Sequence, residues 1–563
     1  MRDPIVIIGS GATAVHFAQT ALELGRKVVM LDVGFTKPAP TLPAASLNQL
    51  KTDLADPVQY FLGDDYEALI LPDDSSEYYG FPPSKNYVFR ELPGYAIEAK
   101  GFSPLLSFAT GGLAQAWTGG CYPFIDAELE AFPFGWDELE PSYSEVARRI
   151  GVTGSTSDDL APFFPAHDGL FAPITLDPHS QQLLGIYEKK RTRVNERGFF
   201  MGHARLASLS RAHNGRSACT FSGRCLWGCP NQAIYTPSVT LEHCKRQPGF
   251  EYLGGMRADH FRFDDSNRVT HVVGFPVNGS APVVREVGTL VLAAGCLPSG
   301  RIVLESLLRA GERRELSGLM DNRQVLMPFV NLRQVGERFE DRSYQYHQLA
   351  IGAPGARPFD YVHGLVTALT TAMIHPVVQT LPVGARTALA LFRNIHAALG
   401  LVNINFADER RPGNQLGLEV DAHGRSTKLL VSYSPDPRER ERVDPMVRRF
   451  RNFLAALGCI APPNMTRWRP MGASVHYAGT LPMSETGGDL TTDRAGRCRP
   501  FENLLVADGS TFPSLPAKNL TFTLMANATR IAHEALGTGS LLESRPKGRA
   551  HSLPVATALR ASE

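Results

Sequence analysis

The sequence predicts an α/β fold organised around a Rossmann-like nucleotide-binding unit at its start. Three observations predict it: an apolar strand at Ile5–Ile8, a glycine turn that opens a helix, and a second apolar strand at Val28–Leu31. Four consecutive apolar residues are typical of a buried strand in a parallel sheet. The chain has 563 residues, of which 43% are hydrophobic and 20% charged, so it is long enough to form several globular domains.

The turn after the first strand has the G-x-G-x-x-G/A pattern in the context that this pattern requires. Gly9 permits the tight turn, Gly11 lets the backbone approach a pyrophosphate, and Ala14 keeps helix and strand close. The helix N-terminus offers free N–H groups to that anion. Asp32 ends the second strand, where it can accept hydrogen bonds from a ribose, which disfavours NADP. FAD and NAD both remain as cofactors on these residues alone.

Overall composition narrows the class of protein. The net charge of +1 gives no bulk attraction to nucleic acid, so we expect no such partner. The first strand begins at Pro4 or Ile5 and leaves no room for a secretory signal, from which we expect a cytoplasmic location. Eight cysteines in a chain of this length do not indicate a disulfide scaffold.

The next stretches differ in how much they indicate. Thr36 to about Pro93 is rich in Pro, Asp, Ser and Tyr and predicts surface loops. Residues 109–122, ATGGLAQAWTGGCY, contain two glycine pairs, which allow either a close backbone approach to a ligand or an ordinary turn. Trp136 to Ile150 predicts an amphipathic helix.

Three cysteines are grouped in the middle of the chain. Cys219, Cys225 and Cys229 have the spacing C-x5-C-x3-C, and Cys244 or His243 is the nearest candidate for a fourth ligand. Thiolates bind iron–sulfur clusters and zinc, but the spacing is not that of a standard zinc finger. An iron–sulfur centre, zinc and three buried thiols all remain open on spacing alone.

Two later segments have the pattern of a strand followed by a glycine turn. One is Thr289 to Leu307, TLVLAAGCLPSGRIVLESL, which predicts a strand, a turn at Gly295 and a helix. The other is a strand at 504–507 that ends at Asp508 and Gly509 and precedes a helix-like run from Leu520 to Ala535. Both segments are of the kind that brings backbone toward a bound dinucleotide.

Tyr361 to Ala385 contains no Asp, Glu, Lys or Arg. Pro376 and Pro382 interrupt the run, so we expect a helical pair rather than one long helix, with Arg386 and Arg393 on the second arm. Exposing such a run to water is costly, so something must cover it. A buried or lid element is the first interpretation, and a membrane-surface patch is the alternative.

Four segments, in order, resemble the glucose–methanol–choline (GMC) oxidoreductases. They are IVIIGSGATA, ATGGLAQAW, LVLAAGCLPSGRIVLES, and VHYAGTLPM with NLLVADGSTFPSLPAKNLTFTLMANATRIA. The resemblance implies a discontinuous FAD domain (1–150, 215–310 and 470–540), an inserted α+β substrate domain (151–214 and 311–469) and a flexible tail (541–563). It also implies oxidation of an alcohol, such as a sugar or polyol, with His476 as base and Asn519 as its partner.

The same resemblance assigns the cofactor residues. Gly9, Gly11 and Asp32 would hold the ADP half of FAD, the segment from Gly111 and Gly112 to Trp117 and Thr118 would pass beside the flavin ring, and Asp508 and Gly509 would contact the pyrophosphate and ribityl chain. Some members attach FAD through a histidine at the position of Ala116, so here we expect non-covalent FAD. The family's proline after the catalytic histidine is replaced by Tyr477.

The cysteine trio is similar to that of the flavoprotein subunits of some bacterial sugar dehydrogenases, which hold a three-iron (3Fe-4S) cluster. That similarity favours a dehydrogenase over an oxidase and implies an electron-acceptor protein. Two other functions stay open: an NAD-linked Rossmann dehydrogenase, and a non-catalytic electron-transfer flavoprotein that docks on membranes through 361–385.

Overall fold

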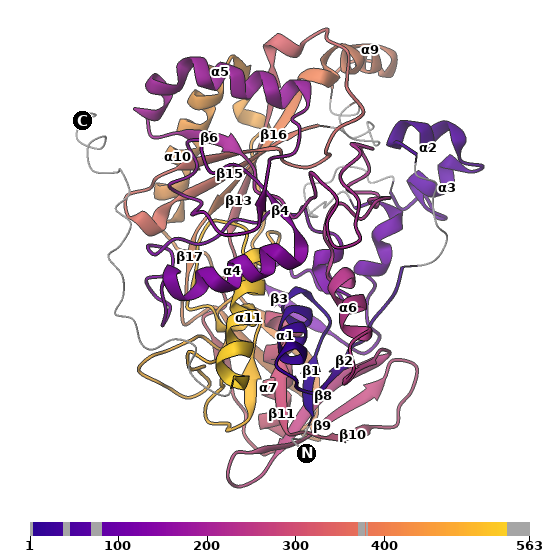
Figure 1. Cartoon of the computed structure of the whole chain (residues 1–563), viewed down its shortest axis with the longest axis vertical. Helices are drawn as coiled ribbons and strands as arrows, with labels where there is room; N and C mark the ends of the chain where they lie inside the picture. Colours follow the sequence, from indigo (N-terminus) through magenta and orange to yellow (C-terminus); the bar gives the residue numbers. More distant parts are fainter. Residues whose placement is uncertain (1–3, 38–44, 69–80, 370–377, 379–380, 538–563) are drawn as a thin grey trace.

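The computed structural model describes residues 4–37, 45–68, 81–369, 378 and 381–537. It has a lower part built on a parallel sheet and an upper part built on a mostly antiparallel one (Figure 1). The expected flexible tail, 541–563, lies outside the described residues.

The lower sheet is the predicted nucleotide-binding unit. Its five parallel strands have the order β22-β11-β1-β2-β7. They span β22 (Leu504–Val506), β11 (Thr289–Leu292), β1 (Ile5–Ile8), β2 (Val28–Leu31) and β7 (Phe250–Leu253). Alternate residues of β1 face opposite sides: Ile5 and Ile7 belong to one apolar cluster, Val6 and Ile8 to another.

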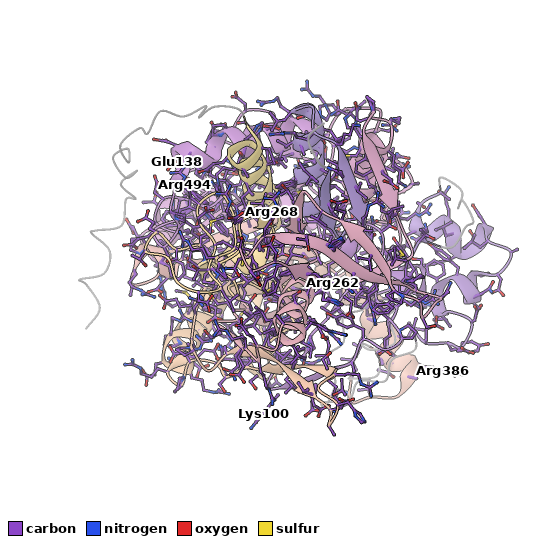
Figure 2. All side chains as sticks on the ribbon, turned by 90° about the horizontal axis from the view of Figure 1, so that it is seen from below. Lys100, Glu138, Arg262, Arg268, Arg386 and Arg494 are labelled. Atoms are coloured by element: carbon purple, nitrogen blue, oxygen red, sulfur yellow. The ribbon has the colours of Figure 1, made fainter. Side chains whose placement is uncertain are left out.

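Helices cover both faces of this sheet. On one face lie α1 (Ala12–Glu23), α4 (Trp136–Ile150), α6 (Pro237–Lys245) and α11 (Thr521–Leu536). On the other lie α7 (Cys296–Arg309) and a sheet of β10 (Val283–Glu286), β9 (Val269–Pro276) and β8 (Met256–Phe263). Arg494 Nη2 donates to Glu138 Oε2 (2.6 Å), which ties α4 to the C-terminal segment (Figure 2).

Most sequence-predicted elements of this part are confirmed. The strands β1 and β2 and the helix α4 have the expected bounds, and the strand–turn–helix at 289–309 is present. The last helix, α11, begins one residue later than expected. The stretch predicted as loops also contains short helices, α2 (Leu47–Asp53), α3 (Pro57–Leu62) and a 3-10 helix at Pro83–Val88.

The upper sheet has the order β20-β13-β16-β15-β14-β6, with β21 (Arg467–Trp468) also paired to β13. The strands span β20 (Cys459–Ile460), β13 (Arg323–Asn331), β16 (Leu399–Phe406), β15 (Val362–Ala368), β14 (Leu349–Ala353) and β6 (Phe200–His203). Two helices, α5 (Pro178–Asn195) and α10 (Glu439–Ala456), pack on one face through a shared apolar cluster. The other face is turned toward the lower part.

Smaller sheets join the two parts. One has the order β12-β18-β19-β3, from β12 (Leu316–Ser317), β18 (Gln415–Val420), β19 (Ser426–Ser432) and β3 (Ile97–Lys100). Two short pairs are β17 (Asp408–Glu409) with β23 (Ser514–Leu515), and β4 (Val152–Thr153) with β5 (Leu170–Phe171).

The expectation of a helical pair over Tyr361–Ala385 is wrong in its first arm. Val362–Ala368 forms β15, a central strand hydrogen-bonded to β14 and β16. A short apolar run suits a buried strand as well as a helix, and here pairing on both edges decides for the strand. Residues 370–377 and 379–380 lie outside the described residues. The expected second arm is α9 (Ala385–Ile395), which carries Arg386 and Arg393. Arg386 lies at the periphery of the molecule (Figure 2).

Within the described part of the chain, no helix is both long enough and apolar enough to cross a membrane.

Candidate active site

The glycine turn after β1 shapes one end of a cavity at the carboxyl edge of the parallel sheet. Gly9 has φ +100°, and a β-carbon there would lie 2.7 Å from the Ala293 carbonyl oxygen. A β-carbon at Gly11 would meet no atom within 4 Å, so the protein leaves open space at this position. Gly112 packs directly on Gly11, with 3.4 Å between its would-be β-carbon and the Gly11 Cα. The turn thus has the shape of a cradle for a ligand at the N-terminus of α1.

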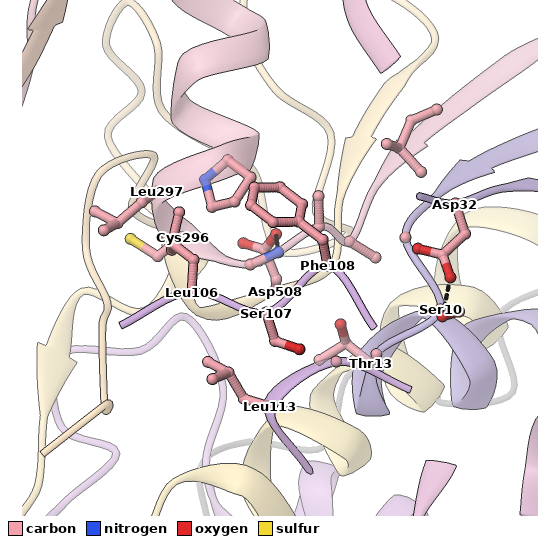
Figure 3. Close-up of a pocket in the computed structure, with 18 of the residues that line it drawn as sticks. Ser10, Thr13, Asp32, Leu106, Ser107, Phe108, Leu113, Cys296, Leu297 and Asp508 are labelled. Atoms are coloured by element: carbon pink, nitrogen blue, oxygen red, sulfur yellow. Dashed lines mark hydrogen bonds between the residues drawn. The ribbon is translucent and has the colours of Figure 1, made fainter. Parts of the chain in front are cut away.

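Asp32 is buried beside this turn. Its Oδ2 accepts hydrogen bonds from Ser10 Oγ (2.5 Å; Figure 3) and from the Tyr252 hydroxyl (2.9 Å). Ser10 Oγ in turn accepts from the Gly111 N–H (2.9 Å). Burial raises the pKa of Asp32 to about 6. The Val33 N–H also donates to this carboxylate, which lines the cavity.

Asp508 closes the cavity from the C-terminal side. Its Oδ2 accepts from Ser299 Oγ (2.6 Å) and the Gly295 N–H (2.9 Å), and its Oδ1 accepts from the Ser510 N–H (3.0 Å). The carboxylate therefore joins the turn after β11 to the turn after β22. This arrangement presents Gly509, rather than the Asp508 side chain, as the ligand-facing group.

The structure brings many of the predicted residues to one cavity and leaves others behind it (Figure 3). Those that line it are Gly9, Gly11, Asp32, Gly112, Asp508, Gly509 and His476. Ala14 is buried in the core behind the turn. Trp117 donates from Nε1 to the Tyr235 carbonyl (2.7 Å), and Thr118 accepts from the Tyr344 hydroxyl (3.1 Å), so these two support the cavity wall from outside.

His476 is held in one tautomer by Asn322. The imidazole Nδ1 lies 2.8 Å from Asn322 Oδ1. The Asn322 amide nitrogen donates to the carbonyls of Phe406 (2.9 Å) and Pro516 (3.0 Å), which fixes which end of the amide is oxygen. An amide oxygen only accepts, so Nδ1 must carry the proton. Nε2 therefore has the free lone pair.

The loop that carries His476 is anchored by a buried carboxylate. Asp321 accepts hydrogen bonds from the Gly472 N–H (2.6 Å) and from the Ser474 hydroxyl, and Ser474 Oγ accepts from the His476 N–H (3.1 Å). Val475, between them, has φ +62°, an unfavourable conformation for a β-branched residue. The anchor holds this loop in a strained shape that aims His476 at the cavity.

Burial shifts the pKa values of His476 and Asp321 away from those of the free side chains. Burial, and then the charge of Arg469, lowers the pKa of His476 to about 4. Burial raises the pKa of Asp321 to about 7. The imidazole is therefore neutral, as a base must be, over the whole neutral range.

Asn519 is close to the site but does not line the described cavity. A β-carbon at Gly120 would lie 3.3 Å from Asn519 Cγ, and the buried Asn519 Oδ1 has no hydrogen-bond partner. A buried amide oxygen without a partner calls for one from a ligand or a water molecule.

The three clustered cysteines share one environment. Each sulfur accepts a backbone N–H: Cys219 from Phe221 (3.4 Å), Cys225 from Gln345 (3.5 Å) and Cys229 from Ala233 (3.2 Å). All three pack against the same apolar cluster. Among the described residues, no group of three His, Cys, Asp or Glu side chains has an arrangement that could hold a metal ion.

Neither candidate for a fourth ligand joins this trio. Cys244 lies in a different core, where its thiol faces the Val15 carbonyl (3.9 Å). His243 lies on the same helix, α6, with its Nε2 3.5 Å from Gln247 Nε2.

Comparisons with known proteins decide the family. Residues 418–528 match the family model described as GMC oxidoreductase. Paromamine 6'-oxidase of Streptomyces fradiae is 24% identical over 95% of this chain and 91% of its own length. The large subunit of fructose dehydrogenase from Gluconobacter japonicus is 22% identical over 94% and 97%. The chain thus carries the C-terminal domain of a GMC oxidoreductase and is similar to members of that family over almost its whole length. It is an enzyme of the alcohol-oxidising type, and FAD is its cofactor.

Solved structures agree with this GMC fold. Pyridoxine 4-oxidase from Mesorbium loti aligns with a TM-score of 0.56 at 15% identity, covering 94% of this chain and 99% of its own. An FAD-dependent oxidoreductase from Chaetomium thermophilum aligns with a TM-score of 0.54 at 14% identity, covering 94% and 98%. The cradle at Gly11 and the Asp32 carboxylate in the cavity wall fit the adenine-dinucleotide half of FAD.

Sequence reasoning missed several residues that organise this GMC site. Ser10 lies inside the glycine motif, where its role as a donor to Asp32 was open to prediction. Tyr252, Asp321 and Asn322 had no such signal, because each lies far along the chain from the residue it holds.

Proposed function

We propose that this GMC oxidoreductase oxidises an alcohol to a carbonyl with Nε2 of His476 as the general base. Bound FAD supplies the hydride acceptor. The observation that carries the assignment of the base is the hydrogen bond of Nδ1 to Asn322, which leaves Nε2 unprotonated. A neutral imidazole in the cavity wall can take the hydroxyl proton of the substrate. Asn519 can hold the substrate oxygen with its amide, without adding charge.

We further propose that FAD is bound non-covalently. The turn at Gly9–Gly11, with Asp32, would hold the ADP half, and Gly112 and Gly509 would face the rest of the cofactor. The position of Ala116 has no side-chain nucleophile, and the residue is buried in a small apolar cluster. Tight packing of Gly112 on Gly11 supports a cofactor that is enclosed by backbone.

Replacing His476 tests the proposal directly. His476→Ala should retain FAD and slow anaerobic flavin reduction by a substrate alcohol at least about a hundredfold, because general-base catalysis contributes about 10²–10⁴. Asn519→Ala should slow it less, because it removes a hydrogen bond and no proton acceptor. Stopped-flow spectroscopy of the FAD-loaded variants measures both rates. A near-normal rate in His476→Ala would remove His476 from the role.

We also propose that Cys219, Cys225 and Cys229 take up an iron–sulfur cluster that passes electrons from the flavin to an acceptor protein. The support is their spacing and the backbone N–H that each sulfur accepts, since hydrogen bonds to sulfur tune such clusters. The thiols would have to draw together around the cluster, because the described arrangement is not that of a metal site.

The cellular setting is a proposal as well. We propose a cytoplasmic enzyme that contacts membranes peripherally through the 361–385 region. Its support is now confined to α9, which carries Arg386 and Arg393 beside exposed Leu391. The strand β15 is covered by its neighbours and cannot contribute.

A further inference from the structure

The face of the upper sheet that is turned away from α5 and α10 carries a row of polar side chains beside apolar ones such as Ala350 and Leu365. Successive residues of a strand point to opposite faces. Val325, Ile351 and Ile404 pack with the two helices. The residues between them on neighbouring strands include a cross-strand row, Gln324–Asn405–His363, and also Asn403. A buried sheet face normally carries apolar side chains, so a row of amides and an imidazole calls for a reason.

Part of this row is satisfied internally. Gln324 Nε2 donates to Asn405 Oδ1 (2.7 Å), and Asn405 Nδ2 donates to the His363 carbonyl (3.3 Å). The Tyr361 hydroxyl lies 3.1 Å from His363 Nδ1. These bonds hold the amides and the His363 ring in fixed orientations. The other ring nitrogen of His363, Nε2, takes part in none of these hydrogen bonds.

Four buried polar atoms at this face have no hydrogen-bond partner. They are His363 Nε2, Asn403 Oδ1, His347 Nε2 and the Tyr122 hydroxyl. Their rings are close: the centroids of Tyr122 and His363 are 4.3 Å apart, and those of Tyr122 and His347 are 6.4 Å apart. Leaving one such atom unpaired costs free energy. Several together indicate a place where a ligand, or water, supplies the partners.

The group adjoins the catalytic residues. A β-carbon at Gly120 would lie 3.0 Å from the Tyr122 ring and 3.3 Å from Asn519. Asn322, which holds His476, directly precedes β13, two residues before Gln324 on the same side of the strand. His476 and His347 both lie near enough to His363 to lower its pKa further, after burial and Lys518. The unpartnered atoms therefore lie beside Asn519 and beside the strand that follows Asn322.

The charges around this group favour a neutral ligand. The nearby cations are Lys518, which is bound by Glu128 (2.6 Å), and Arg469, which donates to Gln324 (2.5 Å). Asp321 is bound by Gly472 and Ser474, and Glu128 is paired with Lys518 through Oε2, whereas Glu128 Oε1 accepts no hydrogen bond within the described residues. A third cation, buried Arg205, acts on Tyr122. Burial holds the pKa of His347 at about 3, so this ring is uncharged. An ammonium group placed here would be desolvated beside these cations.

We infer that Tyr122, His347, His363 and Asn403 form the recognition site for a neutral polyhydroxy substrate, a sugar or polyol that bears no amino group. The inference rests on the proposed function for the position of the reacting hydroxyl at His476. Hydroxyl groups suit this set because each can donate to one unpartnered atom and accept from another. The site orients the substrate ring and leaves the proton transfer to His476.

Binding measurements on the FAD-loaded enzyme test this. The probes are neutral methyl pyranosides and polyols, each paired with its aminodeoxy counterpart, titrated by calorimetry at pH 7. We expect neutral members to bind, and each to bind at least about tenfold more tightly than its amino counterpart. His363→Leu and Asn403→Leu should each weaken the binding of a neutral ligand by about tenfold, the typical effect of one lost hydrogen bond and its unpaired partner.

The matched control is His179→Leu. His179 is also a buried, unpartnered histidine, but it packs on Phe329 at the opposite face of the same sheet. This variant should bind neutral ligands as the parent does. Thermal unfolding and flavin content, measured on each variant, show whether it is folded and FAD-loaded. Two replacements at the site are used so that the loss of one variant still leaves a test.

Three results would overturn the inference: no binding by any neutral probe, equal or tighter binding of the amino counterparts, or unchanged affinity in both site variants. The last result would mean that only water fills the site. The proposed function is judged separately, by anaerobic flavin reduction. Neutral ligands that bind through His363 and Asn403 but never reduce the flavin would contradict the proposed function and support this inference.

Discussion

At the scale of single residues, the site depends on amide groups whose orientation is fixed by backbone carbonyls. Asn322 has its nitrogen engaged by two carbonyls, and its oxygen sets the tautomer of His476. A histidine that is merely buried would be free to protonate either nitrogen. Here one amide removes that freedom and leaves the lone pair of Nε2 for the substrate.

Asn322→Ala should therefore impair the chemical step. Without the acceptor, Nδ1 loses its partner and the ring can populate the wrong tautomer while the base itself remains. We therefore expect flavin reduction to slow by about 10- to 100-fold, less than most of the range of about 10²–10⁴ for loss of a general base. Stopped-flow measurement at saturating substrate gives the rate. Asn331→Ala is the control, because Asn331 is buried at the far end of the same strand and bonds Gln182. It should lose stability but keep the rate, and an equal slowing in both variants would argue against the tautomer role.

The sequence was sufficient for those site residues that belong to a local pattern. Gly9, Gly11 and Asp32 follow from one strand–turn–helix–strand unit, because the same few residues both fold the turn and meet the cofactor. Asn322 and His363 could not be predicted in this way. Each acquires its role from strand pairing between segments that lie far apart along the chain, and neither is part of a recognisable spacing.

At the scale of elements, the contrast between β1 and β15 shows where pattern reading fails. Both are short apolar strands in the middle of a sheet. The glycine turn that follows β1 marks β1 as a strand. By contrast, β15 lies at the start of a long uncharged run, and no glycine turn marks its end. Its helical interpretation was wrong because a run of seven residues, five of them buried, has no period that separates strand from helix. Only the register with β14 and β16 does so.

The cysteine segment is the element whose role is most open to experiment. If it binds a cluster, anaerobically prepared protein should contain stoichiometric iron and sulfide and show a low-temperature electron paramagnetic resonance signal. Cys225→Ser should lose both, since thiolates are the ligands of such clusters. Cys244→Ser is the matched control, because this thiol is buried in another core. Iron below about one atom per chain in the parent protein would leave the three cysteines as ordinary thiols.

At the scale of the whole molecule, the two large sheets carry different sets of residues. The parallel sheet collects its cofactor residues at the carboxyl ends of β1, β2, β11 and β22, as expected for open α/β sheets. The upper sheet carries a row of polar side chains on the face away from α5 and α10. The protein also buries several histidines and carboxyl groups, and burial disfavours the charged forms of these groups.

The shifted pKa values of these buried groups predict how the stability of the fold depends on pH. Burial lowers the pKa of His167, His179 and His476 to about 4, whereas an unfolded histidine titrates near 6.5. As pH falls from 6.5 to 4, the unfolded chain binds protons that the folded one does not, so the stability present above pH 6.5 is lost. Asp32 and Asp321 act in the opposite sense, because burial raises their pKa values to about 6 and 7. As pH rises from about 4, the unfolded chain releases these protons before the folded protein does, so the folded protein loses stability.

Removing one histidine isolates its share from these opposing groups. His179→Leu deletes a buried imidazole with no hydrogen-bond partner, while the carboxyl groups remain. The thermal unfolding midpoint of the FAD-loaded parent, compared at pH 7.5 and pH 5.0, should therefore fall by more than that of the variant. Comparing each protein with itself cancels any change in packing that does not depend on pH. Equal falls in both proteins would mean that His179 is already charged in the fold or titrates alike in both states, and the assignment of a lowered pKa by burial would be wrong.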